Sequence, residues 1–368
     1  KTTARMEIYN RRHSRAVGNP DFDFSEVEGN CRYAQPPDSC LRENGGGCVS
    51  KFPLCRKNIL HEPPRLKRTK MNPNNQDLRT RFIFDDMPVR GLHVRLEEVW
   101  RHIVGRKQYP AAIRRALGEL LAAGALLSSN LKLEGTLIVQ VQGQGRLKML
   151  VVEATSNQTC RATARWDETA QIGGNETMRD LLGENGVFVI TVQPQDGEPW
   201  QGVVPLEGGS IAEMLTHYML RSEQLETHIT LAADGDTASG LLLQRLPEET
   251  LDEDAWAHVT ALADTVTAEE LLKLDAQHLL YRLFHETPPR VFEPETLEFA
   301  CTCSRGKVSD MLLMLGGEEV SSIVAEEGSI SVDCDFCNEK YVFDETDVNA
   351  LFGADVVNAV REGQHRLQ

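Results

Sequence analysis

Two pairs of cysteines near the C-terminus form the clearest chemical pattern in the sequence. One pair is Cys301-Thr-Cys303 and the other is Cys334-Asp-Phe-Cys337, with 30 residues between them. Zinc prefers four thiolates in a tetrahedron, with zinc–sulfur distances of about 2.3 Å. Two closely spaced pairs on separate loops supply that set of ligands. The spacing therefore predicts one zinc ion held by all four cysteines.

The C-x-C pair is less usual than C-x-x-C at a structural zinc site, and it indicates redox chemistry. Metal-bound sulfur is already thiolate, the form that oxidants attack. A disulfide that closes across one residue strains the backbone, and strained disulfides are labile and regulatory. We therefore expect that the site can be oxidised to Cys301–Cys303 and Cys334–Cys337 disulfides, with loss of zinc.

Loss of the metal should have a large effect on folding. A tail of about 60 residues has little core of its own. Structural zinc contributes roughly 10–16 kcal/mol to such folds, which is comparable to the stability of a whole domain, about 5–15 kcal/mol. Expulsion of zinc is thus expected to unfold the tail.

Composition limits the function classes that fit the chain. Its 368 residues are enough for two or three domains, and 41% are hydrophobic, so it can bury real cores. The formal net charge of −16 argues against a general nucleic-acid binder. No apolar run reaches the roughly 18–20 residues that span a bilayer, and the start lacks the apolar core of a secretory signal. We expect a cytoplasmic protein whose nine cysteines serve metal or redox chemistry.

Charge and turn formers place a boundary at Met71. Residues 1–70 carry a net charge of +6, whereas residues 71–368 carry −22. The first segment has no sustained hydrophobic period and is interpreted as a disordered or non-native extension. A small zinc or disulfide knot is one alternative, although the gaps between its four cysteines match no paired zinc pattern: Cys31, Cys40, Cys48 and Cys55. A transit peptide is another, but its acidic residues are atypical of one: Asp21, Asp23, Glu26 and Glu28.

Residues 71–247 mix helix and strand patterns and predict an α+β core domain. Apolar residues recur at helical spacing after Pro110, up to Leu127. A β-hairpin with a glycine turn is expected over 135–153. The remaining expected elements are strands at 187–192, 202–204, 227–231 and 240–246, and a helix at 211–221.

No convincing catalytic set accompanies these elements, so we expect no enzymatic activity. The segment Gly143-Gln-Gly145 precedes a strand, whereas a phosphate loop must precede a helix. The scattered histidines, His217, His228 and His258, are interpreted as surface or satisfied core residues. Cys160 is expected to be a semi-buried small residue.

Residues 248–300 form an acidic stretch with helical order, of net charge −10. Thr267 begins a capping box, and Asp275 can cap a further helix. One interpretation is an amphipathic helical layer on the core domain. The other is a conditional layer, because short helices depend on packing; its melting would expose Trp256, Leu262, Leu280 and Phe284.

Seven motifs occur in order from Met71 onward, over nearly 300 residues. They are Arg90-Gly91, Glu119-Leu-Leu121, Gly202-Val-Val-Pro-Leu-Glu207, Tyr218-Met-Leu-Arg-Ser-Glu-Gln-Leu225, Cys301-Thr-Cys-Ser-Arg305, Ile323-Val-Ala-Glu-Glu-Gly-Ser-Ile330 and Val332-Asp-Cys-Asp-Phe-Cys337. Together these motifs resemble the heat shock protein 33 family of redox-regulated holdase chaperones.

The resemblance implies an ATP-independent chaperone with an α+β core domain, a helical linker (248–300) and a C-terminal zinc and redox-switch domain (301–368). Members are reduced, zinc-bound, inactive monomers. Oxidation joins neighbouring cysteines, releases zinc and unfolds the linker. The protein then dimerises and binds unfolding client proteins. Cys160 and the cysteines before Met71 are outside that pattern.

Two other functions remain open from the residues. A thiol-disulfide oxidoreductase could use Cys334 and Cys337, but its motif lacks the following helix that lowers a thiol pKa in thioredoxin-like sites. A zinc-ribbon nucleic-acid binder would need more basic residues near the cysteines than Arg305, Lys307 and Lys340.

Overall fold

The computed structural model describes residues 67–68, 77–131, 134–246 and 253–353. Contacts along the chain divide it into two units. The larger comprises Leu66–Cys303 together with Asp333–Lys340, and the smaller includes Ser304–Val332 and Tyr341–Gln368. The short segment Asp333–Lys340 thus brings the second cysteine pair into the larger unit, where the first pair also lies.

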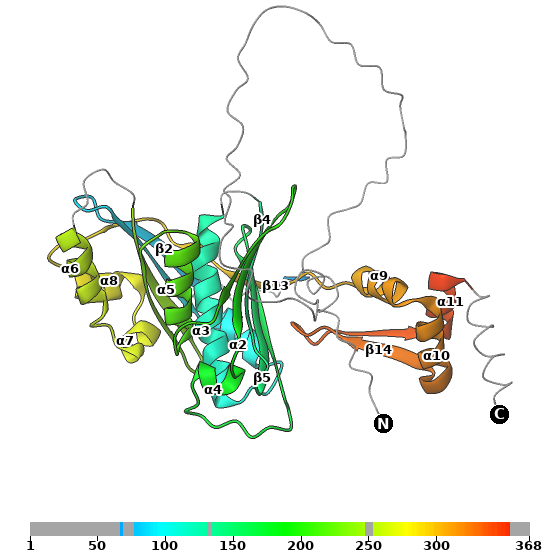
Figure 1. Ribbon diagram of the computed structural model, residues 1–368. Coiled ribbons are helices and arrows are strands. Elements are labelled where there is room, and N and C mark those ends of the chain that lie inside the picture. The colour runs from blue at the N-terminus through cyan, green and yellow to red at the C-terminus, as the bar shows by residue number, and fades with distance from the viewer. Residues whose placement is uncertain (1–66, 69–76, 132–133, 247–252, 354–368) are drawn as a thin grey trace, which may run out of the picture. The chain divides into compact units, whose positions relative to one another are not determined.

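The larger unit contains two sheets (Figure 1). In the first sheet β13 runs parallel to β6 and the other neighbours are antiparallel. Its order is β1 (Lys67–Arg68), β13 (Glu298–Cys301), β6 (Thr159–Trp166), β5 (Leu147–Thr155), β4 (Gly135–Gln142), β7 (Val187–Pro194) and β8 (Trp200–Pro205). The second has the order β11 (Arg290–Val291), β2 (Leu78–Ile83), β3 (Val89–Leu96), β10 (Ala238–Arg245) and β9 (Thr227–Ala233), with β12 (Glu295–Thr296) also on β2.

Helix α3 (Ala111–Leu127) lies between the two sheets (Figure 1). It packs on β3, β9 and β10 of one sheet and on β4, β5 and β6 of the other. Such a position requires a helix that is apolar on all sides, and 13 of its 17 residues are buried. Shorter helices complete this part of the unit: α2 (Glu98–Val104), α4 (Met178–Leu182) and α5 (Ile211–Ser222).

Two glycines of the sequence motifs allow close packing of aromatic rings. A Cβ atom at Gly91 would lie 2.1 Å from the Phe82 ring, and one at Gly202 would lie 2.4 Å from the Tyr218 hydroxyl. Neither ring has room to withdraw, since Phe82 and Tyr218 are each only 1% exposed. The glycine in each motif is therefore required by packing.

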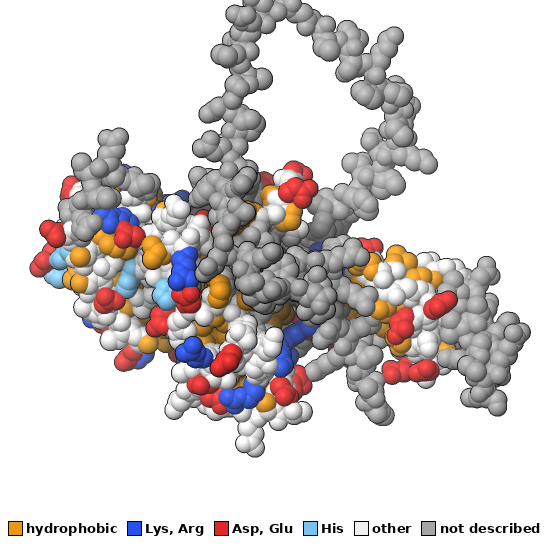
Figure 2. Space-filling model, viewed as in Figure 1, with side chains coloured by type: hydrophobic (Ala, Val, Ile, Leu, Met, Phe, Trp, Pro, Cys, Tyr) orange, Lys and Arg blue, Asp and Glu red, His pale blue; other side chains and the backbone are white. Residues whose placement is uncertain are grey.

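The acidic stretch forms three short helices on the face of the second sheet that is remote from α3. They are α6 (Glu253–Ala263), α7 (Ala268–Lys273) and α8 (Ala276–Phe284). Leu279, Leu283 and Phe284 join one buried cluster with Phe82 and Leu241 of the sheet. Thr267 and Asp275 cap α7 and α8 as predicted. Acidic and histidine side chains lie on the outer surface of this layer (Figure 2).

The smaller unit has its own core. Its helices are α9 (Arg305–Leu315), α10 (Gly317–Glu327) and α11 (Glu345–Phe352), and β14 (Ser329–Asp333) pairs with β15 (Lys340–Asp344). Its buried apolar side chains include Leu312, Val320 and Phe343. The tail thus has more core than its length led us to expect.

The mixed α+β fold class is confirmed, and so are the expected helices and strands between 111 and 245. The patterns did not predict β2, β3 or β6, nor the elements of the smaller unit. Cys160 is fully buried rather than semi-buried. The extension and its four cysteines lie outside the described residues, except for Lys67–Arg68 in β1. The division into four domains remains a prediction.

Candidate metal centre

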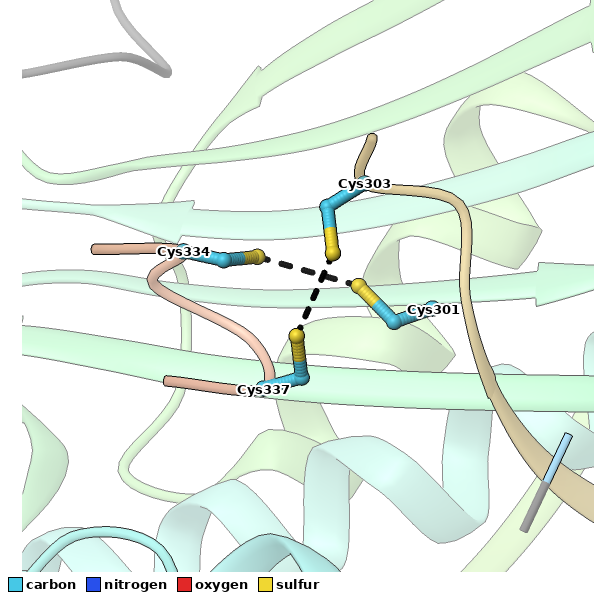
Figure 3. Close-up of side chains that lie close together, drawn as sticks. All are labelled: Cys301, Cys303, Cys334 and Cys337. Atoms are coloured by element: carbon cyan, nitrogen blue, oxygen red, sulfur yellow. Dashed lines mark hydrogen bonds between the residues drawn. The ribbon is translucent and has the colours of Figure 1, made fainter. Parts of the chain in front are cut away.

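The sulfur atoms of Cys301, Cys303, Cys334 and Cys337 converge at one point. All four lie within 4.8 Å of one another, and the side chains point toward a common centre (Figure 3). The Cys301 and Cys334 sulfurs are 3.7 Å apart, and those of Cys303 and Cys337 are 3.3 Å apart. None of the four is in a disulfide. The structure thus brings together the complete predicted ligand set.

A strand end and a tight turn position the two pairs. Cys301 is the last residue of β13, and Cys303 follows it two residues later. Cys334 and Cys337 lie in the turn between β14 and β15. The first pair is therefore fixed by β13, which lies between β1 and β6 in the seven-stranded sheet, and the second by the geometry of its own turn.

Two backbone hydrogen bonds close the turn that carries the second pair. The Asn338 N–H donates to the Cys334 carbonyl over 2.8 Å, and the Cys334 N–H donates to the Glu339 carbonyl over 2.9 Å. Asn338 has a positive φ of 52°, a left-handed conformation that asparagine tolerates. The turn therefore brings the Cys334 and Cys337 sulfurs to the same centre (Figure 3).

The distances fit a tetrahedral zinc site. Zinc–sulfur bonds of about 2.3 Å in a tetrahedron place the sulfurs about 3.8 Å apart, close to the separations seen here. A disulfide would require about 2.05 Å. Cys301 and Cys337 are buried, whereas Cys303 and Cys334 are half-buried. A metal held by these four residues would thus have two buried and two partly exposed ligands.

The electrostatics of the four thiols favour one anion in the absence of a cation. Hydrogen bonds from Cys303, Cys334 and Cys337, together with the charge of Arg161, lower the pKa of Cys301. The hydrogen bond to Cys301 raises the pKa of Cys334, because a second negative charge so close to the first is disfavoured. A divalent cation removes this repulsion and allows all four sulfurs to be thiolates.

Three arginines of the larger unit contact the site. Arg161 donates from Nη1 to the Cys301 sulfur over 3.2 Å. Arg165 donates to the Asp335 carboxylate over 2.5 Å, and Arg106 donates to the Cys337 carbonyl over 2.5 Å. No pattern in the sequence predicted these contacts. Arg161 and Arg165 lie four residues apart on β6, so they share one face of that strand, but that strand was not predicted.

The other candidate residues do not form a site. Gly143 and Gly145 lie in the turn between β4 and β5, as predicted. His217 and His258 are exposed and far apart in the sequence, and the Nε2 atom of His228 lies 3.6 Å from the Asp264 carboxylate. Burial raises the pKa of the Cys160 thiol to about 12. An unreactive thiol of this kind agrees with a packing role.

Comparisons with known proteins identify the family. The family described as "Hsp33 protein" matches residues 77–344. The chain belongs to the Hsp33 family. A 33 kDa chaperonin of Neisseria meningitidis serogroup A is 77% identical over 288 residues, which cover 78% of this chain and 95% of that relative. A 33 kDa chaperonin of Chromobacterium violaceum is 50% identical over 297 residues, covering 80% of this chain and 100% of the relative.

A solved structure supports the Hsp33 fold. The crystal structure of the 33 kDa chaperonin of Thermotoga maritima, a heat shock protein 33 homologue, has a TM-score of 0.66 and 24% identity. The match covers 75% of this chain and 97% of the Thermotoga maritima chain. The family match and the curated relatives confirm the resemblance stated from the sequence. Because the family is one of chaperones, the expectation that the chain is not an enzyme is confirmed at the level of the family.

Among residues 67–68, 77–131, 134–246 and 253–353, no helix combines the length and the hydropathy that crossing a bilayer requires.

Proposed function

We propose that the chain is a redox-regulated, ATP-independent holdase chaperone of the cytoplasm. In its reduced form Cys301, Cys303, Cys334 and Cys337 hold one zinc ion and the protein is an inactive monomer. Oxidation releases the zinc, unfolds the helical linker and yields a dimer that binds unfolding client proteins. The convergence of the four sulfurs is the observation that carries this proposal. The proposed domains are 1–70, 71–247, 248–300 and 301–368.

The activating step forms two disulfides and consumes two equivalents of a peroxide. Each pair, Cys301–Cys303 and Cys334–Cys337, gives up two electrons and forms one sulfur–sulfur bond. Each peroxide accepts two electrons and two protons and becomes two water molecules. Bound zinc supplies the charge that keeps four neighbouring sulfurs anionic. Sulfurs joined in disulfides are neutral and cannot hold the ion.

The position of the linker supports a connection between the site and the helices. Only 16 residues separate Phe284, at the end of α8, from Cys301. This connection contains β11 and β12, which pair with β2 beneath the same helices, and then β13. Phe284 stacks edge-on against Phe84, with ring centroids 5.1 Å apart. A conformational change at Cys301 and β13 would thus act on the connection that leads directly to α8.

Two other functions have less support. A thioredoxin-like oxidoreductase needs a helix directly after its C-x-x-C motif, and here the strand β15 follows Cys337. A nucleic-acid binder needs clustered basic side chains, and the described arginines near the cysteines are already engaged with Glu153, Asp335 and the Cys337 carbonyl.

The proposal is tested by following zinc, thiols and client aggregation together. The reduced, zinc-loaded chain is treated with peroxide at mildly elevated temperature. We expect one zinc per chain to reach a chromophoric chelator while four thiols, identified by alkylation and mass spectrometry, become protected. Suppression of light scattering by a heat-unfolding client should appear over the same period. Equal suppression by the reduced, zinc-loaded chain would contradict the proposal.

A further inference from the structure

We propose that Arg161 is a positioning residue that joins the four-cysteine site to the outer face of the seven-stranded sheet and holds it there only while the sulfurs are anionic. This inference rests on the proposed function, because it takes the thiolate and disulfide states of the site as its two conditions. It concerns residues of the larger unit alone.

Arg161 contacts three separate segments of the chain. Its Nε donates to the Glu153 carboxylate of β5 over 2.8 Å, and its Nη1 donates to the Cys301 sulfur at the end of β13 over 3.2 Å. Its guanidinium carbon lies 4.2 Å from the centre of the Phe336 ring, which is inside the C-x-x-C turn. One side chain therefore connects both cysteine pairs to the sheet.

Burial makes these contacts sensitive to charge. The side chains of Arg161 and Glu153 are only 13% and 12% exposed. A hydrogen bond from a guanidinium to an anionic acceptor is about twice as strong as a neutral one, whereas a buried donor that loses its acceptor has a desolvation penalty. The Cys301 sulfur is an anionic acceptor as a thiolate and a poor, neutral one in a disulfide.

Two neighbouring arginines bind the same turn through acceptors of fixed charge. Arg165 lies on the same strand as Arg161, but it donates to the Asp335 carboxylate. Arg106 donates to the Cys337 backbone carbonyl. On oxidation, the two pairs of thiolates give four electrons to two peroxide molecules and become disulfides. The charges of the Asp335 carboxylate and of the Cys337 carbonyl do not change in this step. Arg161 instead donates to a sulfur atom, so its contact distinguishes the two states of the site.

The two arginines of β6 give a matched pair of variants. Arg161→Gln is combined with Glu153→Gln, so that no buried carboxylate is left without its partner. Arg165→Gln removes the contact with the Asp335 carboxylate. The double variant Arg146→Gln with Glu176→Gln removes an arginine–glutamate pair from another part of the same unit, where the two side chains lie 2.9 Å apart. Circular dichroism and thermal unfolding establish that each variant folds.

Zinc affinity is measured on the full, reduced chain by competition with a chromophoric chelator, without oxidant. Partners that orient metal ligands typically change affinity 10–100-fold. We expect about a tenfold or greater loss for the Arg161 and Glu153 double variant, and less than about a threefold change for the other two variants. Hydrogen exchange at residues 334–338 should be faster in the zinc-loaded Arg161 variant than in the zinc-loaded wild type.

Arg161→Lys is the second test, and it remains informative if the double variant does not fold. Lysine retains the charge but not the planar fork, so we expect a zinc affinity between those of the wild type and the double variant. Wild-type affinity in both Arg161 variants, or an equal loss in the Arg165 variant, would overturn the inference. A wild-type chain that binds no zinc would instead overturn the proposed function.

Discussion

The two outer faces of the larger unit are covered by different kinds of interaction. On the seven-stranded sheet, the cysteine turn is held by arginines, carboxylates and sulfur atoms. On the other sheet, α6, α7 and α8 are held by a continuous apolar cluster. A contact to a thiolate responds directly to the oxidation state of the sulfurs, whereas an apolar contact does not. The first face is suited to sensing, and the second to storing apolar surface that can be released.

The largest expected effect follows from removal of one sulfur ligand. Cys301→Ser replaces a thiolate with a hydroxyl that stays protonated at neutral pH, so the site should lose most of a binding free energy of roughly 10–16 kcal/mol. We expect purified Cys301→Ser protein to contain less than a tenth of the zinc of the wild type, measured by elemental analysis.

Cys160→Ala is the matched control for this change. Cys160 is buried in the larger unit and is not part of the sulfur cluster. Its zinc content should equal that of the wild type. Zinc loss in this variant would mean that metal binding depends on general packing of the unit and not on the four ligands.

The apolar packing of α6, α7 and α8 on the second sheet can be disrupted without changing the cysteines. Phe284 is 1% exposed between the helices and the sheet, and truncation of a buried phenylalanine costs about 3–5 kcal/mol. Phe284→Ala should expose the linker while zinc stays bound, detected as faster hydrogen exchange in α6–α8. Tyr281→Ala, on the exposed side of α8 with 75% exposure, should change stability by less than about 0.5 kcal/mol. If Phe284→Ala and Tyr281→Ala had equal effects, α8 would not pack on the sheet through Phe284.

Acid should weaken the apolar face through His93. This histidine is fully buried in β3, its Nε2 has no hydrogen-bond partner among the described residues, and burial lowers its pKa to about 4. Its unfolded pKa is about 6.5, so stability is complete above pH 6.5 and falls as the pH drops toward 4. By linkage the loss is about 2 kcal/mol between pH 7.5 and pH 5.

Urea unfolding at these two pH values measures the effect. In His93→Leu the pH dependence should decrease by most of that amount, whereas a variant of the exposed His258, such as His258→Gln, should keep the wild-type dependence. An unchanged pH dependence in His93→Leu would show that other groups cause the acid sensitivity.

The smallest effect is expected at a helix cap. The Thr267 hydroxyl accepts from the Glu270 N–H, and the Glu270 carboxylate accepts from the Thr267 N–H at the start of α7. Thr267→Ala should destabilise the linker by about 1 kcal/mol. Thr265→Ala, at an exposed position just before the cap, should have a smaller effect in the same urea titration. The reverse order would indicate that the capping box does not stabilise the docked layer.

Some features of these two faces could be predicted from the sequence, and others could not. The cysteine spacing and the caps at Thr267 and Asp275 depend on neighbouring residues, so they were predictable. The strand β6 was not, because its sequence (Thr159–Trp166) consists mostly of small, polar and charged residues and has no strongly apolar face. The arginine contacts depend on the parallel pairing of β13 with β6, a long-range arrangement that no local pattern contains.

The central claim is that the state of the sulfur site controls the docking of the linker helices. It is tested by hydrogen exchange of the reduced, zinc-loaded chain and of the oxidised, zinc-free chain, with α3 as the internal reference. We expect the amides of α8 to lose protection at least about 100-fold on oxidation, corresponding to about 2.7 kcal/mol, while α3 stays protected. Unchanged protection in α8 after complete zinc release, or an equal loss in α3, would contradict the account.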